Sequence, residues 1–225
     1  MTRPVFRGVR AVLFDLDGTL IDSAPDLGAA VDSMRLHRGL PSLPQAHYRA
    51  HTGAGARGML KAAFDISPEH EDFPAMKEEF FMAYEACLTQ RTQLFHEVAA
   101  LVEHLLDAGL MWGVVTNKSQ RFTTPITQSM PLFATASTVI CGDTTAHTKP
   151  HPAPLLEAAH QLALAPGQCI YVGDDERDIR AGHAAGMPTV AARYGYLGPD
   201  ADVASWGADA EVSSPLQVLK LLELP

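Results

Sequence analysis

The sequence predicts an α/β protein, a doubly wound parallel sheet with an inserted helical domain. Short apolar runs alternate with amphipathic helical patterns over residues 93–225, as parallel strands and the helices that cover them require. A further apolar run at residues 9–14 provides a first strand. Residues 21–92 are almost wholly helical in pattern. We therefore expect a core domain of residues 1–20 and 93–225, and a helical domain of residues 21–92.

The start of the helical domain carries a recognisable helix signal. Ser23-Ala24-Pro25-Asp26 matches a capping box with Asp26 in the third helical position, and Pro25 lies inside the first turn. The glycine and prolines of "RGLPSLP" at 38–44 then predict a turn. The first helix of this domain should therefore begin near Ser23 and end before this turn.

Two more helical segments complete that domain. A helix–loop–helix is expected over 45–64, broken by "HTGAGARG". A longer helix follows, and its apolar stripe includes Phe80, Phe81 and Tyr84. A stripe at this spacing favours a packed core over a binding platform.

After residue 92 the expected elements alternate along the chain. In order they are a helix over 97–108 closed by Gly109, the strand "LMWGVVTN", a helix over 119–130 that Pro125 breaks or kinks, the strand "STVICG", a helix over 152–163, the strand "CIYVGD", a helix over 176–186, the strand "PTVAAR", a short strand near 209–212 and a helix over 215–223.

Composition limits the classes of function. The formal charge of −9 argues against a nucleic-acid or anionic-membrane surface, although local groups can still bind a small anion. The N-terminus lacks a signal-peptide pattern, and no apolar run is long enough to span a bilayer. The three cysteines are far apart and in no C-x-x-C arrangement, which predicts reduced thiols. We expect a cytoplasmic monomer or homodimer.

Asp15 and Asp17 follow the first predicted strand directly. In open α/β sheets, ligands bind at the carboxyl ends of the strands. A carboxylate can attack phosphorus without a base, which suits Asp15, and Asp17 can reach the same side to act as an acid and base. Gly18 would allow a sharp turn that brings backbone amides close to phosphoryl oxygens.

Polar residues also follow two later strands. Thr116 and Asn117 offer a hydroxyl, an amide and helix-start N–H groups to a phosphate, although a plain helix cap explains them equally well. Lys149, in "TKPHPAP", can supply a positive charge to a phosphate and to a carboxylate nucleophile. These three residues are candidates for substrate binding.

The stretch "GDDERD" adds an acidic cluster after another apolar strand. Mg²⁺ prefers one or two carboxylates together with waters and phosphate oxygens, and Asp174 and Asp15 can provide the carboxylates. Asp175 and Glu176 are better explained as the acidic first turn of a helix.

Taken together, "DLDGTL", "VTN", "KP" and "GDDERD" resemble the four motifs of the haloacid dehalogenase-like phosphohydrolases, and the helical domain takes the place of their cap. The resemblance implies a Rossmann-like core, Asp15 as nucleophile and Asp17 as acid and base. It implies phosphate binding by Thr116 and Lys149. It also implies Mg²⁺ held by Asp15, the backbone carbonyl of Asp17 and Asp174, with Asp178 supporting the metal site from outside.

Within that superfamily, "DLDGTLIDSAPDL" and "TGAGARGML" resemble phosphoglycolate phosphatases, so a small phosphorylated metabolite is the expected partner. N-acetylmuramic acid 6-phosphate phosphatases have similar core motifs and remain an alternative. A phosphosugar mutase shares the core chemistry, and a receiver-like signalling domain shares the residue types. A dehalogenase is disfavoured, since displacing halide needs no acid at Asp17.

Other residues carry weaker signals. His147 and His151 flank Lys149 and are best explained as ordinary loop histidines. The loop with Gly53 and Gly55 is either a substrate-facing loop or a turn between helices. Arg57 is either a donor to a substrate carboxylate or a solvent-exposed arginine.

Overall fold

The structure, a computed structural model, describes residues 5–198 and 201–224 and divides into two compact units. The first unit contains the chain up to Ile21, residues 94–195 and the chain from Asp202 onward. The second contains residues 22–93 and a short segment that begins at Tyr196. The sequence patterns did not assign this short segment to the helical part, because nothing in its composition links it to helices so far away.

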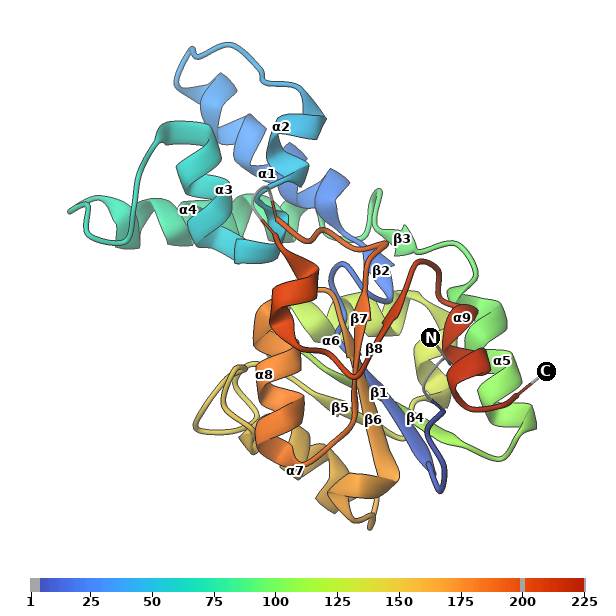
Figure 1. Cartoon of the computed structure of the whole chain (residues 1–225). Helices are drawn as coiled ribbons and strands as arrows, with labels where there is room; N and C mark the ends of the chain where they lie inside the picture. The colour runs from blue at the N-terminus through green and yellow to red at the C-terminus, as the bar shows by residue number, and fades with distance from the viewer. Residues whose placement is uncertain (1–4, 199–200, 225) are drawn as a thin grey trace. The chain divides into compact units, whose positions relative to one another are not determined.

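A six-stranded parallel sheet forms the centre of the first unit (Figure 1), which confirms the predicted fold class. Its strand order is β5-β4-β1-β6-β7-β8, so the first strand in sequence lies at the centre. The strands are β1 (Ala11–Phe14), β4 (Met111–Val115), β5 (Thr138–Ile140), β6 (Cys169–Gly173), β7 (Thr189–Ala192) and β8 (Ala210–Val212). All residues of β1, β6 and β7 are buried, as expected for strands covered on both faces.

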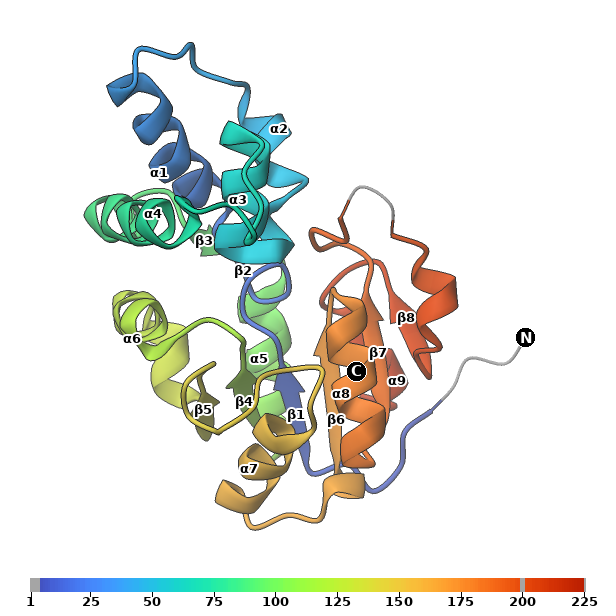
Figure 2. The ribbon, with the colours of Figure 1, turned by 90° about the vertical axis from the view of Figure 1, so that its left-hand side faces the viewer.

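Helices cover both faces of this sheet. Helices α5 and α9 contact one another on one face, and α7 and α8 do so on the other (Figures 1 and 2). The helices of this unit are α5 (Val98–Asp107), α6 (Gln120–Ser129), α7 (Ala153–Gln161), α8 (Glu176–Ala185) and α9 (Gln217–Leu221), with 3₁₀ turns η2 (Pro131–Thr135), η3 (Pro166–Gln168) and η4 (Val203–Trp206). Helix α6 continues through Pro125, so the expected break there does not occur.

The second unit is built mainly from helices. They are α1 (Ala24–His37), α2 (Gln45–Arg49), α3 (Gly55–Phe64) and α4 (Phe73–Cys87), with the 3₁₀ turn η1 (Thr52–Ala54). The chain enters and leaves this unit through two short strands that pair with each other, β2 (Ile21–Asp22) and β3 (Gln93–Leu94). Phe80 and Tyr84 are buried in its core as predicted, whereas Phe81 is only partly buried. No described helix is long and apolar enough to cross a membrane.

Asp26 does not form the expected capping box. The side chain of Ser23 makes no capping hydrogen bond to α1. The fully buried Asp26 carboxylate instead accepts hydrogen bonds from the backbone N–H groups of Arg91 and Thr92 and from Thr92 Oγ1, at 2.6–3.1 Å. Asp26 therefore ties the first helix of the unit to the segment by which the chain leaves it.

Tyr196 joins the distant segment to the same unit. Its hydroxyl accepts hydrogen bonds from the backbone N–H groups of Ser23 and Ala24, at 2.8 and 3.0 Å, and donates to Asp22 Oδ1 at 3.1 Å. The guanidinium of Arg49 bonds both Asp22 oxygens at 2.8 Å and lies 5.2 Å from the centre of the Tyr196 ring. This cluster makes Tyr196 part of the helical unit.

We expect Asp26→Asn to lower the free energy of unfolding by about 2–4 kcal/mol, because an amide nitrogen cannot accept the bonds that the buried carboxylate accepts. Urea denaturation followed by circular dichroism measures the change. Asp72→Asn is the matched control, since Asp72 precedes α4 without capping it through its side chain. Equal midpoints for Asp26→Asn and the parent protein would contradict the role assigned to Asp26.

Candidate active site

Three neighbouring strands end at the candidate site. Asp15 follows β1, Thr116 follows β4 and Asp174 follows β6. Phe14 of β1 is in register with Val114 on one side and Val172 on the other. Because these parallel strands are in register, the residues just beyond their ends lie at the same edge of the sheet. The backbone N–H of Asp15 extends the pairing by donating to Val172 O at 2.9 Å.

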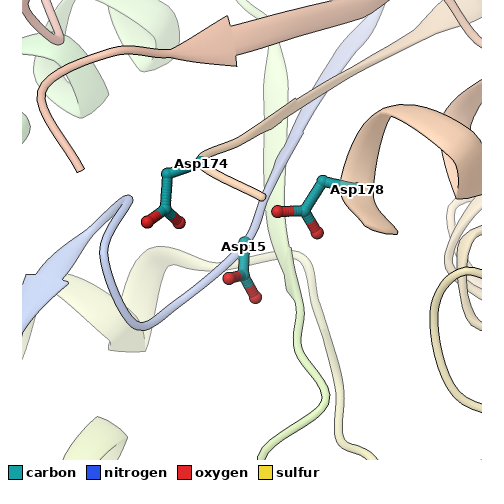
Figure 3. Close-up of side chains that lie close together, drawn as sticks. All are labelled: Asp15, Asp174 and Asp178. Carbon is teal, nitrogen blue, oxygen red and sulfur yellow. The ribbon is translucent and has the colours of Figure 1, made fainter. Parts of the chain in front are cut away.

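An acidic cluster lies at this edge. Carboxylate oxygens of Asp15, Asp174 and Asp178 lie within 4.8 Å of one another (Figure 3). Asp178 comes from the first turn of α8, where Asp175 caps the helix and its backbone N–H donates to Asp178 Oδ2 at 3.1 Å. This capping box agrees with the expectation that Asp175 serves the helix, and it also holds Asp178 in the cluster.

Lys149 neutralises part of this negative charge. Its Nζ lies 2.7 Å from Asp15 Oδ1 and 2.8 Å from Asp178 Oδ1, and it also donates to Val115 O and Tyr171 Oη. The Lys149 side chain is 3% exposed. A buried ammonium with this many oxygen partners is fixed in place, and the carboxylates around it depend on its charge.

The pKa values of these groups follow from their burial and their charges. Burial raises the pKa of Asp15 to about 6 against the opposing effect of Lys149, and the charge of Asp178 adds to the rise. Burial alone would lower the pKa of Lys149, but Asp15 and Asp178 outweigh it and leave that pKa raised. Burial also holds the pKa of Tyr171 well above its usual value, so its hydroxyl stays protonated.

Asn117 fixes the backbone of Lys149. Its Oδ1 accepts from Lys149 N, and its Nδ2 donates to Lys149 O, both at 2.9 Å. The peptide bond between Lys149 and Pro150 is cis. Thr116 is buried beside them, and its Oγ1 accepts a hydrogen bond from Lys118 N at 3.1 Å. The end of β4 and the loop that carries Lys149 are therefore held together by the amide of Asn117.

Asp17 pairs with a lysine that the sequence patterns did not single out. Lys118 Nζ lies 3.1 Å from Asp17 Oδ1 and 3.0 Å from Oδ2. The side chains of Lys118 and Asp17 are 9% and 20% exposed. The position of Lys118 directly after "VTN" was the only available signal, and a lysine near a helix start is usually on the surface.

Two glycines allow the turn around Asp174. Gly18 has a φ of +88°, and a Cβ there would lie 2.2 Å from Asp174 Oδ2. A Cβ on Gly195 would lie 2.3 Å from Asp174 Cβ and 2.5 Å from Gly18 O. Thr19 Oγ1 donates to Asp174 Oδ1 at 3.0 Å. Sequence patterns suggested the turn at Gly18, but they gave no sign of Gly195, which is more than 170 residues away.

The remaining candidates lie in other surroundings. The rings of the exposed residues His147 and His151 lie with their centres 4.2 Å apart, tilted by 32° from each other. Gly53, Gly55 and Arg57 are exposed residues of the helical unit. Of the residues predicted for the site, Asp15, Asp17, Thr116, Asn117, Lys149, Asp174 and Asp178 all lie in the first unit and are linked by the contacts above or by sequence neighbours.

The site combines a buried carboxylate beside an ammonium, a second carboxylate two residues away, and an acidic cluster with the hard oxygen ligands that Mg²⁺ prefers. Such a site can bind a phosphate and present a nucleophile to it.

Comparisons with known proteins agree with this chemistry. Residues 12–192 match the model of a family described as haloacid dehalogenase-like hydrolase. A phosphoglycolate phosphatase of Xanthomonas campestris pv. campestris is 47% identical over 93% of this chain and 94% of that protein. An N-acetylmuramic acid 6-phosphate phosphatase of Pseudomonas putida is 41% identical over 96% of each chain.

A solved structure shows the same fold over almost the whole chain. It is described as a predicted phosphoglycolate phosphatase from Haemophilus somnus, and it is 29% identical with a TM-score of 0.83 over 95% of this chain and 98% of that one. The chain therefore belongs to the haloacid dehalogenase-like hydrolases, which confirms the resemblance seen in the motifs. The family and these relatives support phosphatase activity.

We expect Gly195→Ala to lower the free energy of unfolding by about 1–3 kcal/mol, because its methyl group would overlap Asp174 and the backbone of Gly18. Thermal or urea unfolding measures the loss. Gly167→Ala is the control, since a Cβ at Gly167 meets no atom within 4 Å. If both variants were as stable as the parent protein, the close approach at Gly195 would be wrong.

Proposed function

We propose that this haloacid dehalogenase-like phosphatase hydrolyses a small phosphomonoester, 2-phosphoglycolate, through a phosphorylated Asp15. The observation that carries the proposal is the Asp15 carboxylate at the end of the central strand, bonded to the buried Lys149 and adjacent to Asp174 and Asp178. The ammonium lowers the repulsion between this carboxylate and an incoming phosphate.

The reaction has two steps. In the first, an Asp15 carboxylate oxygen attacks phosphorus, the bond from phosphorus to the bridging oxygen breaks, and Asp17 gives its proton to that oxygen. In the second, water attacks phosphorus and gives a proton to Asp17, and the bond to Asp15 breaks to release phosphate. Asp17 is thus restored for the next cycle.

The acidic cluster fits Mg²⁺, because its carboxylates converge within 4.8 Å and hard oxygen donors suit this ion. Asp15, Asp174 and the backbone carbonyl of Asp17 are the residues that would hold it. Asp178 is bonded to Lys149, Tyr171 and the backbone of Asp175, so its role is to support the site from outside. When bound, the metal ion offsets the charge of the carboxylates and of the phosphate oxygens.

Thr116 and Lys149 bind the phosphate in this proposal. Both are buried at the end of the sheet, and Lys149 reaches the nucleophile directly. The side-chain amide of Asn117 bonds both the backbone N–H and the backbone carbonyl of Lys149. We therefore assign Asn117 to positioning Lys149, in place of the direct contact with substrate that the sequence suggested.

The relatives favour two substrates. Similarity to phosphoglycolate phosphatases supports 2-phosphoglycolate. The phosphoglycolate phosphatase reported above is 47% identical to this chain, against 41% for the N-acetylmuramic acid 6-phosphate phosphatase. Similarity to N-acetylmuramic acid 6-phosphate phosphatases supports that sugar phosphate as the second candidate. The helical unit, as the cap of the enzyme, would contribute to the choice between them. We further propose a cytoplasmic enzyme, monomeric or dimeric, in line with its three free thiols.

A phosphate-release assay with Mg²⁺ tests the proposed function. We expect a higher kcat/KM for 2-phosphoglycolate than for N-acetylmuramic acid 6-phosphate or common sugar phosphates. The reverse order between the first two would establish the second candidate. No phosphate release from any small phosphomonoester would contradict the proposal as a whole.

Asp15→Asn tests the mechanism. We expect kcat to fall by about a thousandfold or more, because the amide is not a nucleophile. Glu176→Gln is the matched control, since Glu176 is an exposed residue in the first turn of α8, and it should keep the parent activity. Full activity in Asp15→Asn would rule out the phosphorylated Asp15.

Removal of divalent ions tests the metal. We expect dialysis against a chelator to abolish phosphate release and added Mg²⁺ to restore it, because the carboxylates and the phosphate then lack their positive partner. The readout is the rate of phosphate release before and after Mg²⁺ is added back. Undiminished turnover in the chelator would exclude a metal requirement.

A further inference from the structure

We propose that Lys118 recognises a carboxylate on the leaving group of the substrate and so selects phosphorylated carboxylic acids such as 2-phosphoglycolate. This inference rests on the proposed function, because it uses Asp17 as the acid that protonates the leaving group. It assigns a role to a partly buried lysine that the reaction steps above do not use.

Lys118 is held firmly at the end of β4. Its backbone N–H donates to Thr116 Oγ1 at 3.1 Å, and its backbone carbonyl accepts from Gly142 N at 2.8 Å. Gly142 permits this approach, since a Cβ there would lie 2.2 Å from Asn117 O. The base of the Lys118 side chain is therefore fixed, while its four-carbon stem can still move the ammonium over a short range.

The two lysines of the site serve different carboxylates. Lys149 bonds Asp15, the nucleophile, together with Asp178. Lys118 bonds both oxygens of Asp17 at 3.0–3.1 Å. One ammonium thus lies beside the group that attacks phosphorus, and the other lies beside the group that protonates the leaving oxygen.

The role of Asp17 indicates on which side of a bound phosphate Lys118 lies. To transfer its proton, Asp17 must contact the bridging oxygen between phosphorus and the organic part of the substrate. An ammonium bonded to Asp17 therefore lies on the leaving-group side of the phosphate. In 2-phosphoglycolate a single methylene carbon separates the bridging oxygen from the carboxylate, so the carboxylate comes within reach of this ammonium.

The charges also suit such a contact. An ammonium has three N–H donors, so Lys118 can bond Asp17 and a substrate carboxylate together. Because its side chain is 9% exposed, a charge-assisted hydrogen bond from it is stronger than one at the surface. In N-acetylmuramic acid 6-phosphate the carboxylate is remote from the phosphate along the molecule, so Lys118 is expected to favour the smaller substrate.

The experiment compares two substrates of nearly the same shape, one with a carboxylate and one with a neutral amide in its place. We would measure kcat/KM for 2-phosphoglycolate and for its neutral amide, 2-phosphoglycolamide, in the parent protein and in Lys118→Met. We expect the parent protein to prefer the acid and the variant to lose this preference by about tenfold or more. Lys118→Arg, which keeps the charge, should retain part of the preference.

Two controls make the result decisive. Lys220→Met removes an exposed lysine of α9 and should leave the preference unchanged. If Lys118→Met fails to fold by circular dichroism, Lys118→Gln replaces it, since the amide keeps hydrogen-bonding capacity without the charge.

Each outcome has one interpretation. Equal losses on the acid and the amide would overturn the proposal and limit Lys118 to orienting Asp17. A parent protein that hydrolyses both substrates equally well would also overturn it, while the proposed phosphatase function would stand. If the parent protein hydrolysed neither substrate but released phosphate from others, the assignment to 2-phosphoglycolate and the role of Lys118 would fall together.

Discussion

The ion pairs of the buried Lys149 ammonium with Asp15 and Asp178 are the interaction on which the rest of the site depends. Four acidic side chains, those of Asp15, Asp17, Asp174 and Asp178, gather near the ends of neighbouring strands, where their mutual repulsion opposes folding. The two ammonium groups, those of Lys149 and Lys118, cannot neutralise all four carboxylates, so the site keeps an excess of negative charge. That excess is the physical basis of the proposed Mg²⁺ site, and it makes the placement of Lys149 important for folding.

The residues that hold Lys149 in place are distant from it in the sequence. Asn117 fixes its backbone, while Tyr171 and Val115 O accept from its ammonium. Each of these contacts joins the loop that carries Lys149 to β4, to the residues that follow it or to β6. Any one of them alone is an ordinary hydrogen bond, but together they give a flexible lysine side chain a single position beside Asp15.

Sequence reasoning found the fold and the strand-end carboxylates because both follow from short-range rules. Apolar runs mark the strands, and the residue after each run lies at the carboxyl edge, as Asp15, Thr116 and Asp174 do. Contacts set by loop paths were missed, since no periodicity encodes them. The pair between Lys118 and Asp17, separated by 101 residues, is one example. Asp26 is another example. Its place in a capping pattern predicted a local role, whereas its carboxylate accepts hydrogen bonds from Arg91 and Thr92, 65 and 66 positions away.

Tyr196 has a consequence for exchanging the helical unit between related enzymes. The unit is not encoded by one continuous stretch, since the Tyr196 hydroxyl bonds Asp22 and the backbone at Ser23 and Ala24. A chimaera that transplants only residues 22–93 would carry Asp22 and Arg49 into a host whose own residue replaces Tyr196. The helical unit is then inherited intact only when the helical stretch and the segment that begins at Tyr196 are inherited together, and recombination between the two would separate matched partners.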